Sequence, residues 1–323
     1  MPLGMMEKRR IGSSELEIAP LVLGGNVFGW TADESTSFRI LDQFVDRGGT
    51  MIDTADVYSF WVDGHHGGES ETVIGRWLKR DPAKRAKVQI ATKAGFNDGL
   101  APEVVIRACE ASLARLGVDT IDLYYQHKDD PSVPLADSLG AFDALKRAGK
   151  IRAVGLSQFS AERLDEATNV AASEGLERPC ALQTWYNLVE REKLEGPLRD
   201  VALSHGLGIL PFYGLANGFL TGKYRTSGDL AKSVRGDRVE QYLEGRGMKV
   251  LHAIDRIAAE TGAAPGTVAL AWILAQPGIV GALASATSVE QLSENMAALM
   301  LELNTDQIER LNEASAEPAP ADA

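Results

Sequence analysis

The sequence predicts a single-domain (β/α)8 barrel. Three observations indicate this fold: short apolar runs alternate with amphipathic helical stretches, eight such units follow one another, and 323 residues suit one barrel with long loops. We expect residues 1–315 to form this domain. The Pro- and Ala-rich end, 316–323, is expected to be a disordered tail.

Each unit is expected to be a buried strand followed by a helix. Residues 9–12 and 16–18 precede the repeats and predict a small hairpin. Local signals support the helices: Pro102 stands near one start, Ser160 suits an N-cap, and Gly117 and Gly149 follow two ends. The predicted strands are 21–23, 50–52, 88–91, 121–125, 153–156, 181–183, 208–210 and 279–281. The predicted helices are 34–47, 69–79, 102–116, 135–149, 160–174, 194–205, 265–276 and 288–300, with an extra helix at 249–261.

Two insertions interrupt the repeat, 59–68 after the second strand and 214–248 after the seventh. Both follow the carboxyl ends of strands, so both are expected over the same face of the barrel, where substrate selectivity is usually set. Trp30 and Trp61 lie on loops of this face. Lining of a substrate pocket and simple packing of the loops both remain open for these two side chains.

The composition excludes several classes of partner. The formal charge is −12 and there is no basic run, which argues against nucleic acid or an anionic membrane as a partner. No apolar stretch approaches the roughly 18 residues of a membrane span, and the first ten residues lack the apolar core of a signal peptide. Cys109 and Cys180 lie in apolar surroundings, so we expect reduced thiols and a cytoplasmic location.

Polar side chains stand where three neighbouring strands end. Asp53 follows the run 50–52 and Tyr58 comes five residues later, while Lys93 and His127 end the next two runs. The carboxyl ends of barrel strands share one face, so these four side chains are expected to meet. A tyrosine has an ordinary pKa near 10, so a catalytic tyrosine needs a nearby cation to stabilise its phenolate. Lys93 is the candidate cation.

With these motifs the chain resembles the aldo-keto reductase superfamily over nearly its whole length. The matching motifs are DTADVY at 53–58, ATK at 91–93, QH at 126–127, GLS at 155–157, Gln183, GFLTGK at 218–223 and SVEQLSEN at 288–295. The segment 23–30 and the long final loops look more like the bacterial and potassium-channel-subunit-like branches than the aldose reductase branch. The resemblance implies reversible, nicotinamide-dependent reduction of an aldehyde or ketone to an alcohol.

The resemblance also implies catalytic roles. Tyr58 would be the general acid in reduction and the base in oxidation. Lys93 would lower the pKa of Tyr58, and Asp53 would pair with Lys93 and hold its ammonium in place. His127 would hydrogen-bond the substrate carbonyl.

A set of cofactor contacts follows from the same resemblance. Ser157 and Gln183 would bind the nicotinamide carboxamide, with Gln158 where the family usually has asparagine. Phe212, beside Tyr213, falls where the family stacks a tyrosine on the nicotinamide. Leu215 and Asn217 would follow the pyrophosphate, and Glu294 and Asn295 the adenine.

The chain differs from the family pattern at the positions expected around the 2′-phosphate of NADPH. Ser285 and Gln291 stand where better-known members place a lysine and an arginine, the strongest phosphate partners. Hydroxyls of Ser285, Thr287 and Ser288 and the start of the following helix are the groups left for a phosphate. NADP(H) is favoured because most of the family uses it, and NAD(H) remains open.

Other functions and other roles for these residues also fit parts of the sequence. An NAD-linked sugar or alcohol dehydrogenase, and a regulatory subunit that senses the cofactor with incidental turnover, both remain open. The pair His65 and His66 lacks a third fixed ligand, so no metal site is predicted. A Schiff-base role for Lys93 fits less well beside Asp53 and Tyr58. The expected partner is a small carbonyl or alcohol substrate, and the sequence leaves its identity and the oligomeric state open.

Overall fold

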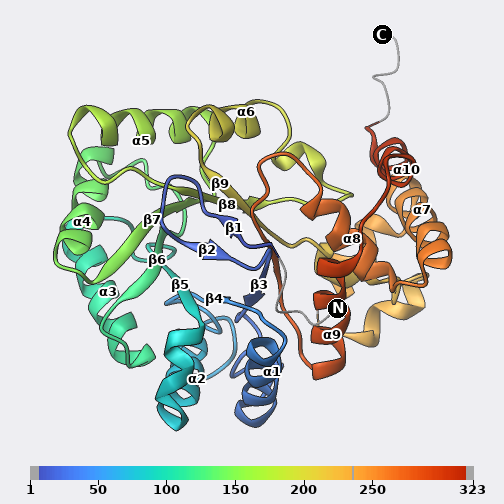
Figure 1. Cartoon of the computed structure of the whole chain (residues 1–323), viewed down its shortest axis with the longest axis horizontal. Coiled ribbons are helices and arrows are strands. Elements are labelled where there is room, and N and C mark those ends of the chain that lie inside the picture. The colour runs from blue at the N-terminus through green and yellow to red at the C-terminus, as the bar shows by residue number, and fades with distance from the viewer. Residues whose placement is uncertain (1–6, 235, 318–323) are drawn as a thin grey trace.

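A computed structural model of the chain describes residues 7–234 and 236–317. Eight parallel strands form the predicted barrel, with helices on the outside (Figure 1). Each strand from β3 to β8 pairs with its successor in the sequence, and β10 pairs with β3. The strands are β3 Leu21–Gly24, β4 Met51–Asp53, β5 Gln89–Ala94, β6 Ile121–Gln126, β7 Ile151–Ser157, β8 Ala181–Trp185, β9 Gly208–Phe212 and β10 Ala282–Ala284.

The barrel closes in two steps at its last strand. Ile279 forms a bridge with Ile209 of β9, and the Val280 N–H donates to the Ile209 carbonyl at 3.0 Å. Three residues further on, β10 pairs with β3, with Leu283 opposite Val22. The strand predicted at 279–281 therefore lies three residues later, at 282–284. The apolar run continues past 281, and its first part pairs with β9 whereas its second part pairs with β3.

The predicted hairpin is confirmed as β1 Arg9–Arg10 and β2 Glu17–Ile18, and it lies across one end of the barrel (Figure 1). Its apolar side chains are buried against Val22, Met51, Cys180 and other residues of the barrel interior. A Cβ on Gly12 would lie 2.2 Å from the Cys180 carbonyl oxygen, so the hairpin backbone is packed directly on the strands. The interior is thus filled with side chains, as is usual for this fold.

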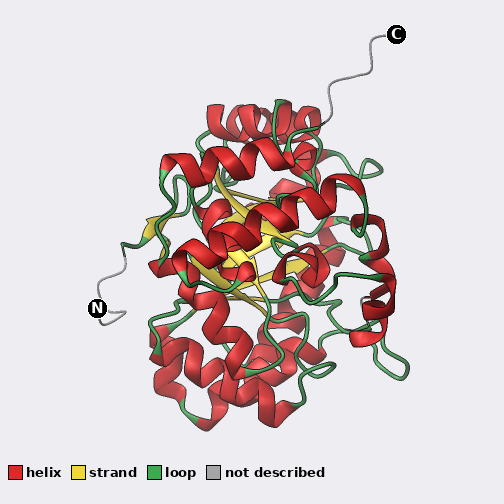
Figure 2. Cartoon of the chain, turned by 90° about the vertical axis from the view of Figure 1, so that its right-hand side faces the viewer, coloured by secondary structure: helices red, strands yellow, loops and turns green. Residues whose placement is uncertain are grey.

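The helices cover the outside of the barrel (Figure 2). A second, larger core lies between them and the strands. Most lie within a few residues of the predicted ranges. The exceptions are α6, which begins at a proline in its first turn, and the last predicted helix, which ends early and continues as a 3₁₀ turn at 298–300. The helices are α1 Glu34–Asp46, α2 Glu69–Arg80, α3 Pro102–Leu116, α4 Leu135–Arg147, α5 Ala161–Ser173, α6 Pro197–Ser204, α7 Gly245–Thr261, α8 Pro265–Leu274, α9 Val289–Ala297 and α10 Thr305–Ser315.

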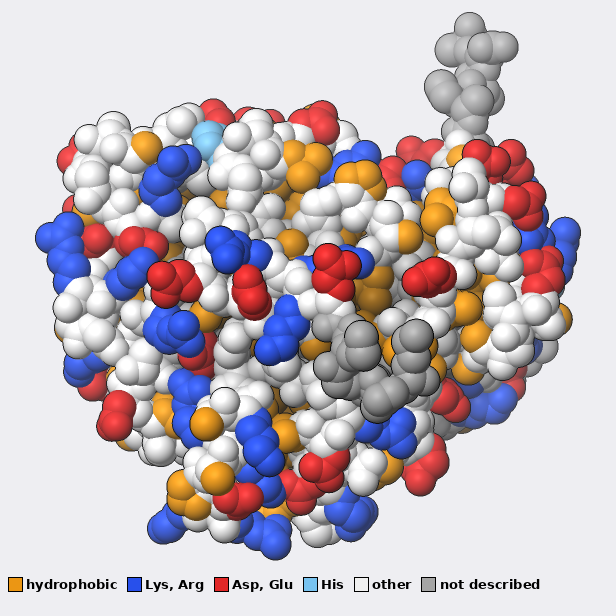
Figure 3. Space-filling model, in the orientation of Figure 1, with side chains coloured by type: hydrophobic (Ala, Val, Ile, Leu, Met, Phe, Trp, Pro, Cys, Tyr) orange, Lys and Arg blue, Asp and Glu red, His pale blue; other side chains and the backbone are white. Residues whose placement is uncertain are grey.

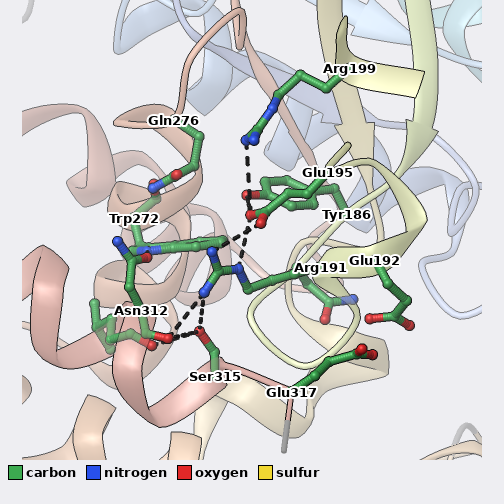
Figure 4. Close-up of polar contacts among 12 residues, drawn as sticks. Tyr186, Arg191, Glu192, Glu195, Arg199, Trp272, Gln276, Asn312, Ser315 and Glu317 are labelled. Atoms are coloured by element: carbon green, nitrogen blue, oxygen red, sulfur yellow. Dashed lines mark hydrogen bonds and ion pairs between the residues drawn. The ribbon is translucent and has the colours of Figure 1, made fainter. Parts of the chain in front are cut away.

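Helix α10 was not predicted. Asn304 caps it and Gln307 returns a hydrogen bond to the cap, a reciprocal pattern that the sequence does contain. Figure 4 shows how the helix end is held: the Arg191 guanidinium donates to the Asn312 carbonyl and to Ser315 Oγ, both at 3.0 Å. Arg191 also pairs with Glu195, whose carboxylate accepts from Tyr186 at 2.6 Å. The last helix is thereby tied to the loop after β8.

The insertion 214–248 consists of short 3₁₀ turns at 216–221, 227–232, 236–238 and 240–242, and α7 begins four residues earlier than predicted. Residues 318–323 of the expected tail lie outside the described residues. On the face in Figure 3, basic and acidic side chains are interspersed. In the described part of the chain no single helix is long and apolar enough to cross a membrane. Helices α7 and α8 meet that criterion only together, and they are bent by 98° at the break between them.

Candidate active site

The four residues singled out at the strand ends lie together. Lys93 Nζ is 2.6 Å from Asp53 Oδ2 and 3.1 Å from the Tyr58 hydroxyl, and it also donates to the Thr54 carbonyl at 2.7 Å. The Tyr58 hydroxyl lies 3.4 Å from Asp53 Oδ2, and its ring is 6.1 Å from the His127 ring. Asp53 and Lys93 are each only 1% exposed. The lysine ammonium therefore links the buried Asp53 carboxylate to the phenol of Tyr58, which is half-buried.

The loop after β4 explains how a residue five positions past the strand reaches this point. The Thr54 N–H donates to the Ala91 carbonyl at 2.8 Å, and the Asp56 N–H to the Lys93 carbonyl at 3.2 Å, so the loop continues to follow β5. Ser59 then adopts a left-handed conformation, with φ of +75°, and its buried hydroxyl donates to the Phe28 carbonyl. The segment that follows β5 therefore ends in a sharp turn directly after Tyr58.

Burial dominates the protonation of the site. It lowers the pKa of Lys93, an effect that the adjacent Asp53 carboxylate opposes. Burial first, and Asp53 after it, hold the pKa of Tyr58 well above its ordinary value, so the lowering expected from Lys93 is outweighed here. Burial and the nearby Lys93 keep the pKa of His127 well below its usual range. At neutral pH the site therefore presents a protonated phenol and a neutral imidazole.

Two further acidic side chains, Glu71 and Asp56, lie near Lys93. Glu71 is fully buried, accepts from Thr92 Oγ1 at 2.6 Å and pairs with Arg115 at 2.6 Å. Asp56 has a buried carboxylate oxygen without a hydrogen-bond partner among the described residues. Burial, with Glu71 as the next cause, raises the pKa of Asp56 to about 7.

Two buried polar atoms on the side of β7 and β9 fit a polar ligand such as a nicotinamide cofactor. Ser157 Oγ and Asn217 Oδ1 are buried without a partner in the described part of the chain, which is costly unless a ligand satisfies them. Gln183 stands opposite Ser157 in the sheet, but its amide donates to Asp53 Oδ1 at 2.8 Å. Gln158, with φ of +56°, donates to the His127 carbonyl at 3.0 Å. Gln158 is thus placed to hold the backbone of His127.

The loop after β9 has an unusual backbone. Tyr213, Ala216, Asn217 and Gly218 all have positive φ, which is uncommon for residues other than glycine. Successive left-handed residues occur where backbone groups approach a ligand. A Cβ on Gly218 would lie 3.1 Å from Lys223 Nζ, so this ammonium packs on the loop. Lys223 belongs to the quoted 218–223 motif, but the sequence did not single it out as a site residue.

The expected adenine-side residues surround the start of α9. Ser285 Oγ donates to Asn26 Oδ1 at 2.5 Å, and Asn295 Nδ2 donates to the Ser285 carbonyl at 3.1 Å. Gln291 Oε1 accepts from both the N–H and the hydroxyl of Thr287. Glu294 is exposed, and Leu215 packs against the core. Gln291 and Asn295 therefore shape the loop that precedes α9.

Aromatic rings border the catalytic residues on two sides. Trp185, Phe212 and Tyr213 contact one another at 4.2 to 5.9 Å on the β8 and β9 side. On the other side Trp61 lies 6.2 Å from Tyr58, and Trp30 lies 5.5 Å from Trp61. A ring thus adjoins Tyr58 on the Trp61 side, and a separate aromatic cluster lies at the ends of β8 and β9.

The His65 and His66 loop makes no metal cluster. The His66 N–H donates to Glu69 Oε1 at 2.8 Å, so this carboxylate is engaged with the loop backbone. Among the described residues no three His, Cys, Asp or Glu side chains gather as a metal ion would need.

Comparison with known proteins adds to this geometry. Residues 20–316 match the model of the Aldo/keto reductase family. The "Uncharacterized oxidoreductase YrpG" of Bacillus subtilis (strain 168) is 32% identical, over 95% of each chain. Two relatives come from Schizosaccharomyces pombe. The "Aldo-keto reductase yakc [NADP(+)]" is 29% identical, covering 89% of this chain and 84% of the relative, and the "Putative voltage-gated potassium channel subunit beta" is 31% identical, covering 90% and 87%.

Proposed function

The chain belongs to the aldo/keto reductase family, and on this premise we propose that it reversibly reduces an aldehyde or ketone to an alcohol with an NAD(P) cofactor. The family consists of oxidoreductases that use nicotinamide cofactors and small carbonyl substrates. The observation that carries the proposal is the single buried ammonium, Lys93, in contact with both the Tyr58 hydroxyl and Asp53.

The proposed mechanism assigns one task to each residue. The nicotinamide cofactor supplies the hydride in reduction and accepts it in oxidation. Tyr58 gives its hydroxyl proton to the carbonyl oxygen, and the Lys93 ammonium at 3.1 Å stabilises the phenolate that remains. Asp53 fixes the position of Lys93, and the neutral His127 imidazole donates a hydrogen bond to the same carbonyl oxygen. A raised pKa of Tyr58 keeps the proton available for reduction.

For the cofactor we propose NADP(H) first. The partnerless Ser157 Oγ and Asn217 Oδ1, the loop 213–218 and the ammonium of Lys223 would hold it. One relative carries NADP(+) in its printed name. NAD(H) use, with oxidation of a sugar or alcohol as the working direction, is the competing proposal, because Ser285 and Gln291 bring no cation to the 2′-phosphate.

A regulatory role is the second candidate function. It is favoured by the relative named as a potassium channel subunit beta. Such a protein would bind the cofactor while turnover stays incidental, whereas an enzyme should exceed about 1 s⁻¹ with some carbonyl compound.

The test combines binding with turnover. Purified protein is titrated with NADPH and NADH by calorimetry, and aldehydes and ketones are screened for cofactor oxidation. Tyr58→Phe should lower kcat by about 10²- to 10⁴-fold while cofactor binding persists. Tyr124→Phe is the matched control, because Tyr124 is a buried tyrosine of β6 whose ring packs on Phe142 of α4, in the core outside the barrel. Equal loss in both variants, or no binding of either cofactor, would contradict the proposal.

A further inference from the structure

We propose that the carbonyl substrate is an aryl compound that carries an anionic group, and that Lys128 is the specificity-determining residue for that group. This inference rests on the proposed function of the same site and names its substrate class. It is carried by two observations, a closed series of aromatic contacts beside Tyr58 and a lysine at its edge without a carboxylate partner.

The aromatic contacts form a closed cycle of five rings. Tyr58 contacts Trp61 at 6.2 Å, Trp61 contacts Phe60 at 5.5 Å, and Phe60 contacts Phe96 at 6.3 Å. Phe96 contacts His127 at 4.8 Å, and His127 returns to Tyr58 at 6.1 Å. The rings come from the loops after β4, β5 and β6, so three separate strand ends contribute to one aromatic surface.

Part of this surface faces water. Phe60 is 39% and Trp61 43% exposed, although both are large apolar side chains. Exposed aromatic groups that adjoin catalytic residues are typical of ligand sites, and ring pairs favour edge-to-face or offset contacts with another aromatic group. A planar aryl body fits this surface better than a flexible polar chain such as an open sugar.

Lys128 brings a positive charge to the edge of the cycle. Its ammonium lies 4.8 Å from the centre of the Phe96 ring, while its backbone directly follows His127. In the described part of the chain no carboxylate lies within ion-pair distance of it. The neighbouring acids have other partners: Asp129 is paired with Arg163 at 2.7 Å, and Asp130 accepts from the Leu100 N–H and from Ser132. The charge of Lys128 also lowers the pKa of Asp130, but it is the smallest of the causes that do so.

The spacing defines where the anionic group would be. The Phe96 ring centre is 4.8 Å from both the His127 ring and the Lys128 ammonium, so the ammonium lies no further than twice that distance from the imidazole. The proposal places the carbonyl at His127 and the carboxylate at Lys128, with one aryl ring between them. A benzaldehyde with a carboxylate in the para position has this arrangement.

The experiment measures both binding and turnover for a charged and a neutral ligand of the same shape. The binding probes are 4-(hydroxymethyl)benzoate and 4-(hydroxymethyl)benzamide, titrated by calorimetry in the presence of NADPH. The turnover probes are the two corresponding aldehydes. The wild type is compared with Lys128→Met, which keeps an apolar stem over Phe96, and with Lys87→Met, which removes the same charge at the opposite end of β5.

We expect the wild type to bind the benzoate about tenfold more tightly than the benzamide, and to show the same ratio in kcat/KM. Lys128→Met should abolish the ratio by weakening only the anionic ligand, while Lys87→Met retains it. The ratio should also shrink as salt is added, because the ammonium is exposed.

The outcomes separate this inference from the proposed function. Reduction of both aldehydes with equal kcat/KM, or a preference that Lys128→Met leaves unchanged, would overturn the role of Lys128 and leave the reductase intact. Lys128-dependent binding of the benzoate without any turnover would support the anionic aryl ligand and contradict the reductase. Absence of both binding and turnover would overturn both.

Discussion

Gln183 on β8 donates a 2.8 Å hydrogen bond to Asp53 on β4, a residue 130 positions earlier in the chain. Asp53 thus has one oxygen occupied by Gln183 and the other by Lys93. The same glutamine stands beside Ser157, a residue proposed to bind the cofactor. The carboxylate of Asp53, proposed to act in catalysis, and the proposed cofactor side of the barrel therefore share a side chain.

Replacement of Gln183 by Ala should affect catalysis and cofactor binding together. A hydrogen bond to a charged group contributes about 1.5–3 kcal/mol, so we expect kcat for reduction to fall at least tenfold and the Kd for NADPH to rise. Ser157→Ala is the matched comparison, and it should raise Kd with little change in kcat. Stopped-flow turnover and calorimetry measure the two effects, and equal effects on kcat in the two variants would argue against the shared role.

Removal of the Asp53 charge should destabilise the fold as well as the chemistry. Asp53→Asn leaves the buried Lys93 without its counter-ion, and breaking a buried pair on one side costs about 3–5 kcal/mol in the free energy of unfolding. The double variant Asp53→Asn/Lys93→Met should be more stable than Asp53→Asn alone, since no buried charge remains. Urea unfolding of the wild type, the two single variants Asp53→Asn and Lys93→Met, and the double variant checks this, and additive losses would contradict it.

Asp56 should make stability depend on pH. The folded protein keeps the Asp56 proton up to about pH 7, while the unfolded chain loses it near the ordinary aspartate pKa of 3.8. The folded state therefore binds more protons between these values, and the contribution of Asp56 to stability falls as pH rises through this window. Asp56→Asn should be more stable than the wild type at pH 8 by about 2 kcal/mol, with allowance for partial exposure, and nearly equal at pH 4. Asp119→Asn, at an exposed position after α3, should show no such difference.

The rate of reduction should be nearly independent of pH across neutrality. Burial keeps the pKa of Tyr58 well above, and that of His127 well below, their ordinary values, so the predominant form of each group stays the same between about pH 6 and 9, while the minor phenolate fraction of Tyr58 grows with pH. Oxidation needs the phenolate and should accelerate with rising pH over the same range. Steady-state profiles in both directions test this. An inflection near pH 6.5 in reduction that disappears in His127→Gln would show that the imidazole titrates.

Gly155 is required by the barrel interior. A Cβ at this position would lie 2.4 Å from two atoms of the Tyr125 ring, and that ring stands 5.9 Å from Lys93 Nζ. Gly155→Ala should therefore cost about 1–3 kcal/mol of stability and lower kcat by displacing Tyr125 towards the lysine. Gly140→Ala is a matched control within α4, where a Cβ meets no atom within 4 Å, and it should slightly stabilise the helix. Thermal unfolding and turnover of both variants decide the matter.

The strand ends were predictable because the barrel itself dictates where they meet. Asp53, Lys93 and His127 each follow an apolar run, and parallel closure brings all such ends to one face. The contacts between them depend on side-chain geometry, and sequence spacing gives none of it. The direction of the Tyr58 pKa is an example, since burial outweighs the nearby ammonium.

Other features depend on partners far apart in the chain. The cycle of rings joins loops that follow three different strands, and neither Phe60 nor Phe96 has a periodic signal of its own. The division of the last strand between β9 and β3 likewise follows from closure, which a linear apolar run does not reveal. Helix α10 differs, because the sequence itself contains the capping pattern of Asn304 and Gln307 that marks its start.

The hairpin across one end of the barrel has a consequence for the order of events. With that end covered and the interior packed, the described part of the chain leaves the end that holds Tyr58 as the route for cofactor and substrate alike. Two ligands that share one open end of the barrel can block each other's entry and exit. For the proposed cofactor and substrate this predicts an ordered sequence of binding and release, in which the ligand that lies deeper enters first and leaves last.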